Sequence, residues 1–224
     1  MTQPRTIAVG DVHGCIHALD AVLDAIQPGG DDQLVLMGDY IDRGHESRAV
    51  IDRILELSGR CHVVSLLGNH ELMLLRGLAA ADERHFWLQF GGRETLDSYG
   101  GHPSWIPPAH LDFMRSCLRF FETETHFFVH ANYAPDLDLS EQPESLLLWT
   151  HLIRSVPAPH KCGKIAVVGH TPQVSGEILD LGHLICVDTY CVGGGWLTAL
   201  DVANRTVWQA DRSGHMRTPD SAQA

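Results

Sequence analysis

The segment TIAVGDVHG, residues 6–14, decides the fold: an apolar run of strand length ends in glycine, and an aspartate and a histidine follow shortly after. Two further apolar runs end in a similar way, with GDYIDRG at residues 38–44 and GNHE at residues 68–71. Between these runs, apolar side chains recur at steps of three and four residues, which is the period of an amphipathic helix. The first half of the chain therefore predicts alternating strands and helices, typical of an α/β domain.

The second half is richer in short apolar runs and glycine turns, and it continues the pattern with HAN at residues 130–132 and GHTP at residues 169–172. These runs predict a layered α/β fold with two sheets. Since no repeat or linker interrupts the chain, one domain is expected over residues 1–211, with residues 212–224 as a flexible polar tail. The expected strands are residues 6–9, 33–37, 61–67, 126–129, 164–168, 184–187 and 196–200.

The composition is that of an ordinary globular protein: 44% of the 224 residues are hydrophobic and 20% are charged. Acidic residues outnumber Lys and Arg by 28 to 16, a net charge of −12, which argues against nucleic acid as a partner. No apolar run is long enough to span a membrane and the start does not resemble a signal peptide, so we expect a cytoplasmic protein with no membrane partner. The six cysteines form no CxxC pair and are expected to be reduced.

The loops that follow the carboxyl ends of strands in an α/β sheet converge on one crevice, so the five motifs are expected to meet. One such motif is ordinary turn chemistry, but five in succession, all of metal-ligand types, predict a metal site. Asp11 and His13 lie two residues apart and can chelate one ion, while Asp39 has two oxygens and can bridge to a second. The second ion would also have three neutral ligands: Asn69, His130 and His170. This mixture suits Mn²⁺, Fe²⁺ or Zn²⁺.

Two such divalent ions would clamp a phosphate and lower the pKa of a bridging water, which gives a hydroxide for in-line attack at phosphorus. His70 is the candidate general acid for the leaving group, and Asp42 is the candidate partner that orients it and keeps it protonated. Arg43 is expected to bind phosphate oxygens as a fork, and Asn69 to lie against the same phosphate. Glu71 is expected to interact with a helix macrodipole rather than to act in catalysis.

The order GDVHG, GDYIDRG, GNHE, HA and GHT resembles the phosphoprotein phosphatase family, as its bacterial and phage-type serine/threonine phosphatases and the related diadenosine tetraphosphatases carry it. The resemblance extends over residues 6–211 and includes GGRETLDSYG at residues 91–100. It implies a metallophosphatase αββα sandwich, with two central mixed sheets flanked by helices. It also implies the six metal ligands given above: Asp11, His13, Asp39, Asn69, His130 and His170. It implies His70 and Asp42 as the acid pair, and Arg43 as the phosphate contact.

The chain departs from the family pattern at three places. It has Asn132 after His-Ala where the family usually has glycine, and Tyr190 where glycine is common. Bacterial relatives usually carry Trp-x-Arg before the GHT strand, and that arginine contacts phosphate, whereas this chain has His151 there and Arg154 three residues later. On a helix Arg154 would lie on roughly the same face, so either residue could supply the contact, and we favour Arg154.

The substrate expected first is a phosphate monoester, phosphoserine or phosphothreonine on a protein. The alternative within the same chemistry is a dinucleoside polyphosphate such as diadenosine tetraphosphate, because that hydrolase shares the metal motifs. A third possibility is a non-catalytic phosphate-binding module, against which the full set of ligands and the His70–Asp42 pair argue.

Overall fold

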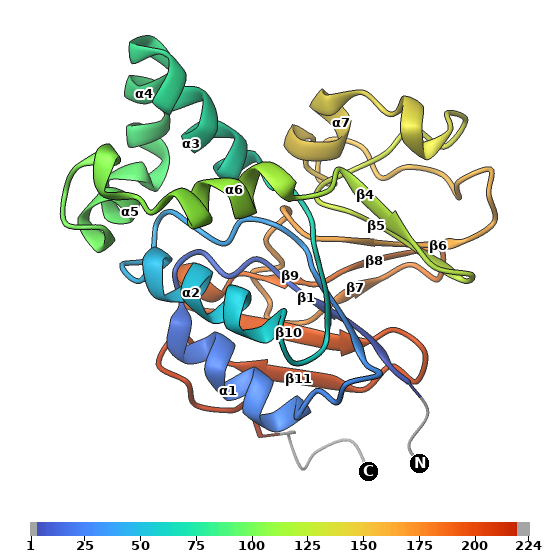
Figure 1. Ribbon diagram of the computed structural model, residues 1–224. Helices are drawn as coiled ribbons and strands as arrows, with labels where there is room; N and C mark the ends of the chain where they lie inside the picture. The colour runs from blue at the N-terminus through green and yellow to red at the C-terminus, as the bar shows by residue number, and fades with distance from the viewer. Residues whose placement is uncertain (1–3, 219–224) are drawn as a thin grey trace.

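The computed structural model describes residues 4–218 and contains two β-sheets packed face to face, with helices on the outside (Figure 1). In the first sheet the strand order is β11-β10-β1-β2-β3, and β9 pairs with β10. Its strands are β1 (Thr6–Val9), β2 (Gln33–Leu36), β3 (His62–Ser65), β9 (Asp188–Thr189), β10 (Trp196–Asp201) and β11 (Val207–Ala210). The second sheet has the order β4-β5-β6-β8-β7. Its strands are β4 (Phe120–Glu122), β5 (His126–Val129), β6 (Ile165–Val168), β7 (Leu179–Asp180) and β8 (Leu184–Cys186).

Helices cover the outer faces of this sandwich, so the expected fold class is confirmed. The α-helices are α1 (Ile16–Ile26), α2 (Ser47–Leu57), α3 (Asn69–Ala79), α4 (Ala81–Trp87), α5 (Arg93–Ser98), α6 (Pro108–Ser116) and α7 (Glu144–Trp149). Between α4 and α5 lies the π-helical turn η1 (Leu88–Gly92), and the 3₁₀ turns are η2 (Pro103–Trp105), η3 (Leu139–Glu141) and η4 (Cys191–Gly193).

The central strands are apolar on both faces because both faces are covered. In β1, Ile7 and Val9 belong to the cluster formed with α1 and α2, whereas Ala8 belongs to the cluster between the two sheets. Strand β2 alternates in the same way, with Val35 packing among residues of the second sheet such as Phe128. This burial on both sides fixes the register of the strands and therefore the positions of the loops that follow them.

The direction of the strands brings the polar loops at the strand ends to one place. Strands β1, β2 and β3 are parallel to one another, and so are β5, β6 and β8 in the second sheet. The carboxyl ends within each set therefore lie at the same edge, as expected for a crevice formed by strand-end loops.

The segment expected to be a tail from Arg212 is partly packed against the domain. Met216 forms a β-bridge with Ala210, and Arg217 donates hydrogen bonds to the Gly176 carbonyl and to Gln209 Oε1. Residues 216 and 217 thus contact the domain, because a polar segment without periodicity can still add to a sheet edge through its backbone. Residues 219–224 lie outside the described residues. None of the helices in residues 4–218 has the length and hydrophobicity that crossing a membrane requires.

Candidate metal centre

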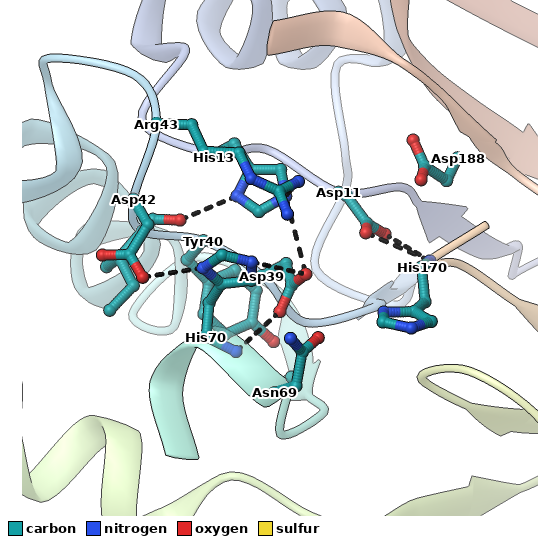
Figure 2. Close-up of polar contacts among 12 residues, drawn as sticks. Asp11, His13, Asp39, Tyr40, Asp42, Arg43, Asn69, His70, His170 and Asp188 are labelled. Atoms are coloured by element: carbon teal, nitrogen blue, oxygen red, sulfur yellow. Dashed lines mark hydrogen bonds and ion pairs between the residues drawn. The ribbon is translucent and has the colours of Figure 1, made fainter. Parts of the chain in front are cut away.

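The strand-end loops meet at one site, and the six residues expected to bind metal all lie there (Figure 2). Each of these side chains belongs to a residue that is 9% exposed or less: Asp11, His13, Asp39, Asn69, His130 and His170. Burying so many polar groups together is unfavourable unless they are paired or bind a cation. The cluster is therefore a candidate for a functional site rather than part of the core.

Asp39 lies at the centre of the cluster. Its Oδ2 atom is 3.5 Å from His13 Nε2, and its Oδ1 atom is 3.5 Å from His130 Nε2. Two groups of potential metal ligands can be defined among the described residues, and Asp39 belongs to both: His13, Asp39 and His70 form one, and Asp39, His130 and His170 the other. This is the position that a bridging carboxylate requires.

The imidazoles of His13 and His130 are held with Nε2 facing Asp39 at the centre of the cluster. His13 Nδ1 lies 2.8 Å from the Ile41 carbonyl and His130 Nδ1 lies 2.7 Å from the Met37 carbonyl, so in each ring Nδ1–H donates and Nε2 keeps its lone pair. Burial lowers the pKa of both histidines, and it lowers the pKa of His170 to about 3. Neutral imidazoles are the form that binds metal ions.

The residues present fit divalent metal ions. Within the described part of the chain, His170 Nε2 and His70 Nε2 are buried without a hydrogen-bond partner. Asn69 Oδ1 lies 3.1 Å from His130 Nε2 and adds an amide oxygen to the donor set. Imidazole, carboxylate and amide donors together suit borderline transition-metal ions.

Asp11 occupies a different place from the one that its predicted role suggests. Its carboxylate accepts the backbone N–H of His170 at 3.2 and 3.1 Å, and it belongs to neither of the two ligand groups of residues 4–218. Burial and the nearby carboxylates of Asp188 and Asp39 raise its pKa well above the usual range. A bound cation would offset the repulsion between these carboxylates. Asp11 is therefore a candidate ligand because of this repulsion, and not because of its hydrogen bonds.

His70 forms the expected pair with Asp42. His70 Nδ1 lies 2.7 Å from Asp42 Oδ2, and both side chains are fully buried. Burial lowers the pKa of His70, but the carboxylates of Asp39 and Asp42 outweigh it and raise the pKa above its ordinary value. The two carboxylates thus stabilise the protonated imidazole relative to that of a free histidine, and Nε2 faces Asp39 at 3.9 Å.

Asp42 is itself fixed by two residues whose roles the sequence did not reveal. Trp87 Nε1 donates to both carboxylate oxygens, at 3.0 and 2.9 Å, and the Thr95 hydroxyl donates to Oδ1 at 2.6 Å. A buried indole N–H needs an acceptor, and this requirement could have identified Trp87 as more than a packing residue.

Glu71 anchors the loop after β2 instead of only lying near a helix terminus. Its two carboxylate oxygens accept the backbone N–H groups of four residues: Asp39 at 2.9 Å, Tyr40 at 2.8 Å, Ile41 at 3.3 Å and Gly68 at 3.1 Å. Gly68 allows this close packing, because a Cβ atom there would lie 2.2 Å from Asp39 Oδ1. The GNHE motif thus positions the GDYID loop.

Several site residues adopt left-handed backbone conformations. The φ angles are 44° for His13, 51° for Asp39, 70° for Asp42, 68° for Arg43 and 60° for His170. This region is unfavourable for residues with a Cβ atom, and such strain clusters at functional sites.

A cavity of about 310 Å³ opens beside the cluster. It is lined by Asp39, Arg43, Asn69, His70, Phe86, Phe90, Trp149, His151, His170 and Pro172. Arg43 lies there as expected for a phosphate ligand, and its Nη1 is 2.9 Å from His13 Nε2. Figure 2 shows it beside His13.

The structure separates His151 from Arg154. His151 lines the cavity and stacks on His170, with ring centroids 4.3 Å apart, whereas Arg154 is exposed and is not among the lining residues. The prediction that Arg154 reaches the phosphate assumed a helix, but α7 ends at Trp149 and Leu152 to Arg154 form a turn. Of the described residues that line the cavity, Arg43 is the only arginine.

Asp188, at the start of β9, is a buried carboxylate that the motifs did not include. Burial and the Asp39 carboxylate raise its pKa to about 7, and its Oδ1 accepts the Tyr190 N–H at 3.0 Å. Tyr190 has a φ angle of 66°, the conformation in which a glycine is common at this place in the family pattern. The signal that could have identified Asp188 is its position directly after a strand, like that of the other acidic site residues.

Comparisons with known proteins agree with this geometry. The model of the calcineurin-like phosphoesterase family matches residues 4–202. A symmetrical bis(5'-nucleosyl)-tetraphosphatase of Janthinobacterium sp. (strain Marseille) is 25% identical over 95% of this chain and 98% of its own length.

Two solved structures share the fold. A cold-active protein-tyrosine phosphatase from a psychrophilic Shewanella covers 97% of this chain and 80% of its own, with a TM-score of 0.68 and 18% identity. A protein serine/threonine phosphatase of Saccharomyces cerevisiae covers 97% of this chain and 82% of its own, with a TM-score of 0.62 and 16% identity. Because the family model spans most of the chain and the fold and site agree with it, the protein belongs to the calcineurin-like phosphoesterase family.

Proposed function

We propose that the protein hydrolyses dinucleoside polyphosphates, with a bis(5'-nucleosyl) tetraphosphate as substrate and a symmetrical cut into two nucleoside diphosphates. The observation that carries this proposal is the similarity to a symmetrical bis(5'-nucleosyl)-tetraphosphatase over nearly the full length of both chains. It favours the alternative substrate class of the sequence analysis over phosphoserine or phosphothreonine on protein. A phosphoprotein is the second candidate, because protein phosphatases share the fold.

The cofactor assignment is two divalent metal ions, held by His13, Asp39, Asn69, His130 and His170, with Asp11 beside them. Divalent ions in such a site withdraw charge from phosphate oxygens and make water a stronger acid. Manganese, iron and zinc all suit these donors.

The remaining residues have separate tasks in this proposal. Arg43 donates to the phosphate oxygens from the wall of the cavity, and the Asn69 amide lies on the same wall. His70 presents Nε2–H to the leaving oxygen, while Asp42 accepts Nδ1–H and fixes the ring. His151 is kept neutral, because burial and the charges of Arg154 and Arg43 lower its pKa, so it donates at most one hydrogen bond.

The role of His70 depends on the leaving group. A nucleoside diphosphate leaves as a phosphate with a pKa near 6, whereas a serine alkoxide needs a proton. His70→Asn should therefore slow cleavage of a phosphoserine peptide by about 10²- to 10⁴-fold and cleavage of diadenosine tetraphosphate by less. Equal losses on both substrates would show that His70 places substrate or metal instead.

The proposal is tested by product analysis on protein reconstituted with Mn²⁺. Diadenosine tetraphosphate and a phosphoserine peptide are compared by kcat/KM, and the nucleotide products are separated by chromatography. The proposal requires ADP as the sole nucleotide product and a higher kcat/KM for the dinucleotide. AMP together with ATP would contradict the symmetrical cut, and a preference for the peptide would support the second candidate.

A further inference from the structure

Two phenylalanines lie exposed in the wall of the candidate active site. Phe86 is 43% exposed and Phe90 is 44% exposed, and both line the cavity that also contains Arg43, Asn69 and His70. Their ring centroids are 4.7 Å apart, with an angle of 45° between the ring planes. Large apolar side chains exposed beside a concave polar site mark a ligand-binding surface more often than a part of the core.

The chain around these rings is tied to the catalytic loop at two points. Trp87 is fully buried and donates to Asp42, so the residue next to Phe86 points inward while Phe86 stays in the cavity. Gly91, directly after Phe90, accepts the backbone N–H of Arg43 at 3.2 Å. The position of both rings relative to the phosphate-binding and proton-donating groups is therefore fixed.

The π-helical turn η1 makes the second tie possible. Gly91 has a φ angle of 104°, and a Cβ atom there would lie 2.4 Å from the Arg43 backbone nitrogen. Phe86 and Phe90 are four residues apart, the spacing that places two side chains on one face of a helix. The kink at Phe90–Gly91 then brings the backbone directly against Arg43.

We propose that Phe86 and Phe90 form a stacking site for one nucleobase of the substrate, an inference that rests on the proposed dinucleotide function. A nucleobase offers a flat π-face of the kind that stacks on phenylalanine, and this stacking tolerates any base. Arg43 is the one arginine among the described residues lining the cavity, and the chain has a net charge of −12, so protein cations alone give a polyphosphate little affinity. Stacking of the nucleoside would add affinity to that of the phosphates at the metal ions and Arg43.

The test compares ligands with and without a base. ADP and pyrophosphate are measured as competitive inhibitors of p-nitrophenyl phosphate hydrolysis by the Mn²⁺-reconstituted enzyme, for the wild type and for the Phe86→Ala, Phe90→Ala and double variants. We expect the ADP inhibition constant to rise by about 5- to 150-fold in the double variant, with pyrophosphate unchanged within about twofold. Trp105→Ala, which removes an exposed aromatic ring outside the cavity, is the matched control and should change neither constant.

Two further outcomes decide the inference. Phe→Leu changes at both positions keep apolar volume but remove the π-face, so they should weaken ADP binding almost as much as alanine does, whereas Phe→Tyr changes should not. The stacking site would be overturned if the double alanine variant bound ADP and pyrophosphate more weakly by the same factor. It would also be overturned if the inhibition constant of a phosphoserine peptide rose more than that of ADP. The inhibition constants do not depend on which substrate the enzyme prefers, so a failure of the proposed function is seen separately, in the product analysis.

Discussion

Glu71→Gln is the substitution that tests most directly how the site is held. In the native protein one Glu71 oxygen accepts N–H groups from Tyr40 and Ile41, and the other accepts them from Asp39 and Gly68. Glutamine keeps the shape but replaces one oxygen by an NH₂ group, which faces two N–H donors that it cannot satisfy. Since each buried N–H donor left without an acceptor costs about 1–3 kcal/mol, losing two lowers the free energy of unfolding by about 2–6 kcal/mol.

The assay is urea denaturation followed by tryptophan fluorescence, together with kcat/KM at a temperature where the variant is folded. Activity should fall as well, because Asp39 belongs to the loop that Glu71 holds. Glu124→Gln is the control, since Glu124 is exposed and should change stability by less than about 0.5 kcal/mol. A Glu71→Gln protein as stable as this control, or one with full activity, would refute the anchoring role.

Three further predictions concern charge, metal and phosphate. Arg5 hydrogen bonds lower the pKa of Asp32 to about 2, so the carboxylate stabilises the fold above its unfolded pKa of 3.8, by about 2 kcal/mol, and this is lost as the pH falls from about 4 through 2. Asp32→Asn should therefore cost about 2 kcal/mol in urea unfolding at pH 7 and about half of that near pH 3; a gap that stays constant would contradict the assignment. Asp39→Asn should reduce the metal content of Mn²⁺-reconstituted protein, measured by elemental analysis, from two ions per chain to one or none; two tight ions in the variant would exclude a bridging role. His151→Ala should lower kcat/KM by about 2- to 10-fold, the effect of one hydrogen bond, while Arg154→Ala should change it less than about twofold; the reverse order would show that the phosphate contact comes from Arg154.

The strands, the helices and the site could be predicted where the sequence shows a regular apolar period or a polar motif at the end of a strand. The runs at residues 6–9 and 126–129 became β1 and β5 within the expected bounds, because each is a short apolar run closed by a polar motif. Apolar side chains that recur at three- and four-residue steps after GNHE, at Leu72, Leu75 and Leu78, lie in α3. Parallel strands then bring the motifs together without further information, which is why the candidate site could be predicted from local sequence.

The less predictable part depends on interruptions and on single polar residues. The kink at Phe90–Gly91 ends the helical period, and the contact of Gly91 with the Arg43 backbone had no signal in the sequence. The end of α7 at Trp149 left Arg154 outside the cavity, a boundary of the kind that propensity locates least well. Thr95 is a single polar residue whose partner, Asp42, lies 53 positions away in the sequence.

The left-handed backbone at His13, Asp39, Asp42, Arg43 and His170 has a consequence for how this enzyme can change. Glycine would relieve about 1–2 kcal/mol of steric strain at each position, but it would delete a functional side chain. At Asp42 it would also leave Trp87 Nε1 and the Thr95 hydroxyl without their acceptor. Substitutions that raise the thermal stability and keep the activity are therefore expected on the outer helices and on the surface of the sandwich.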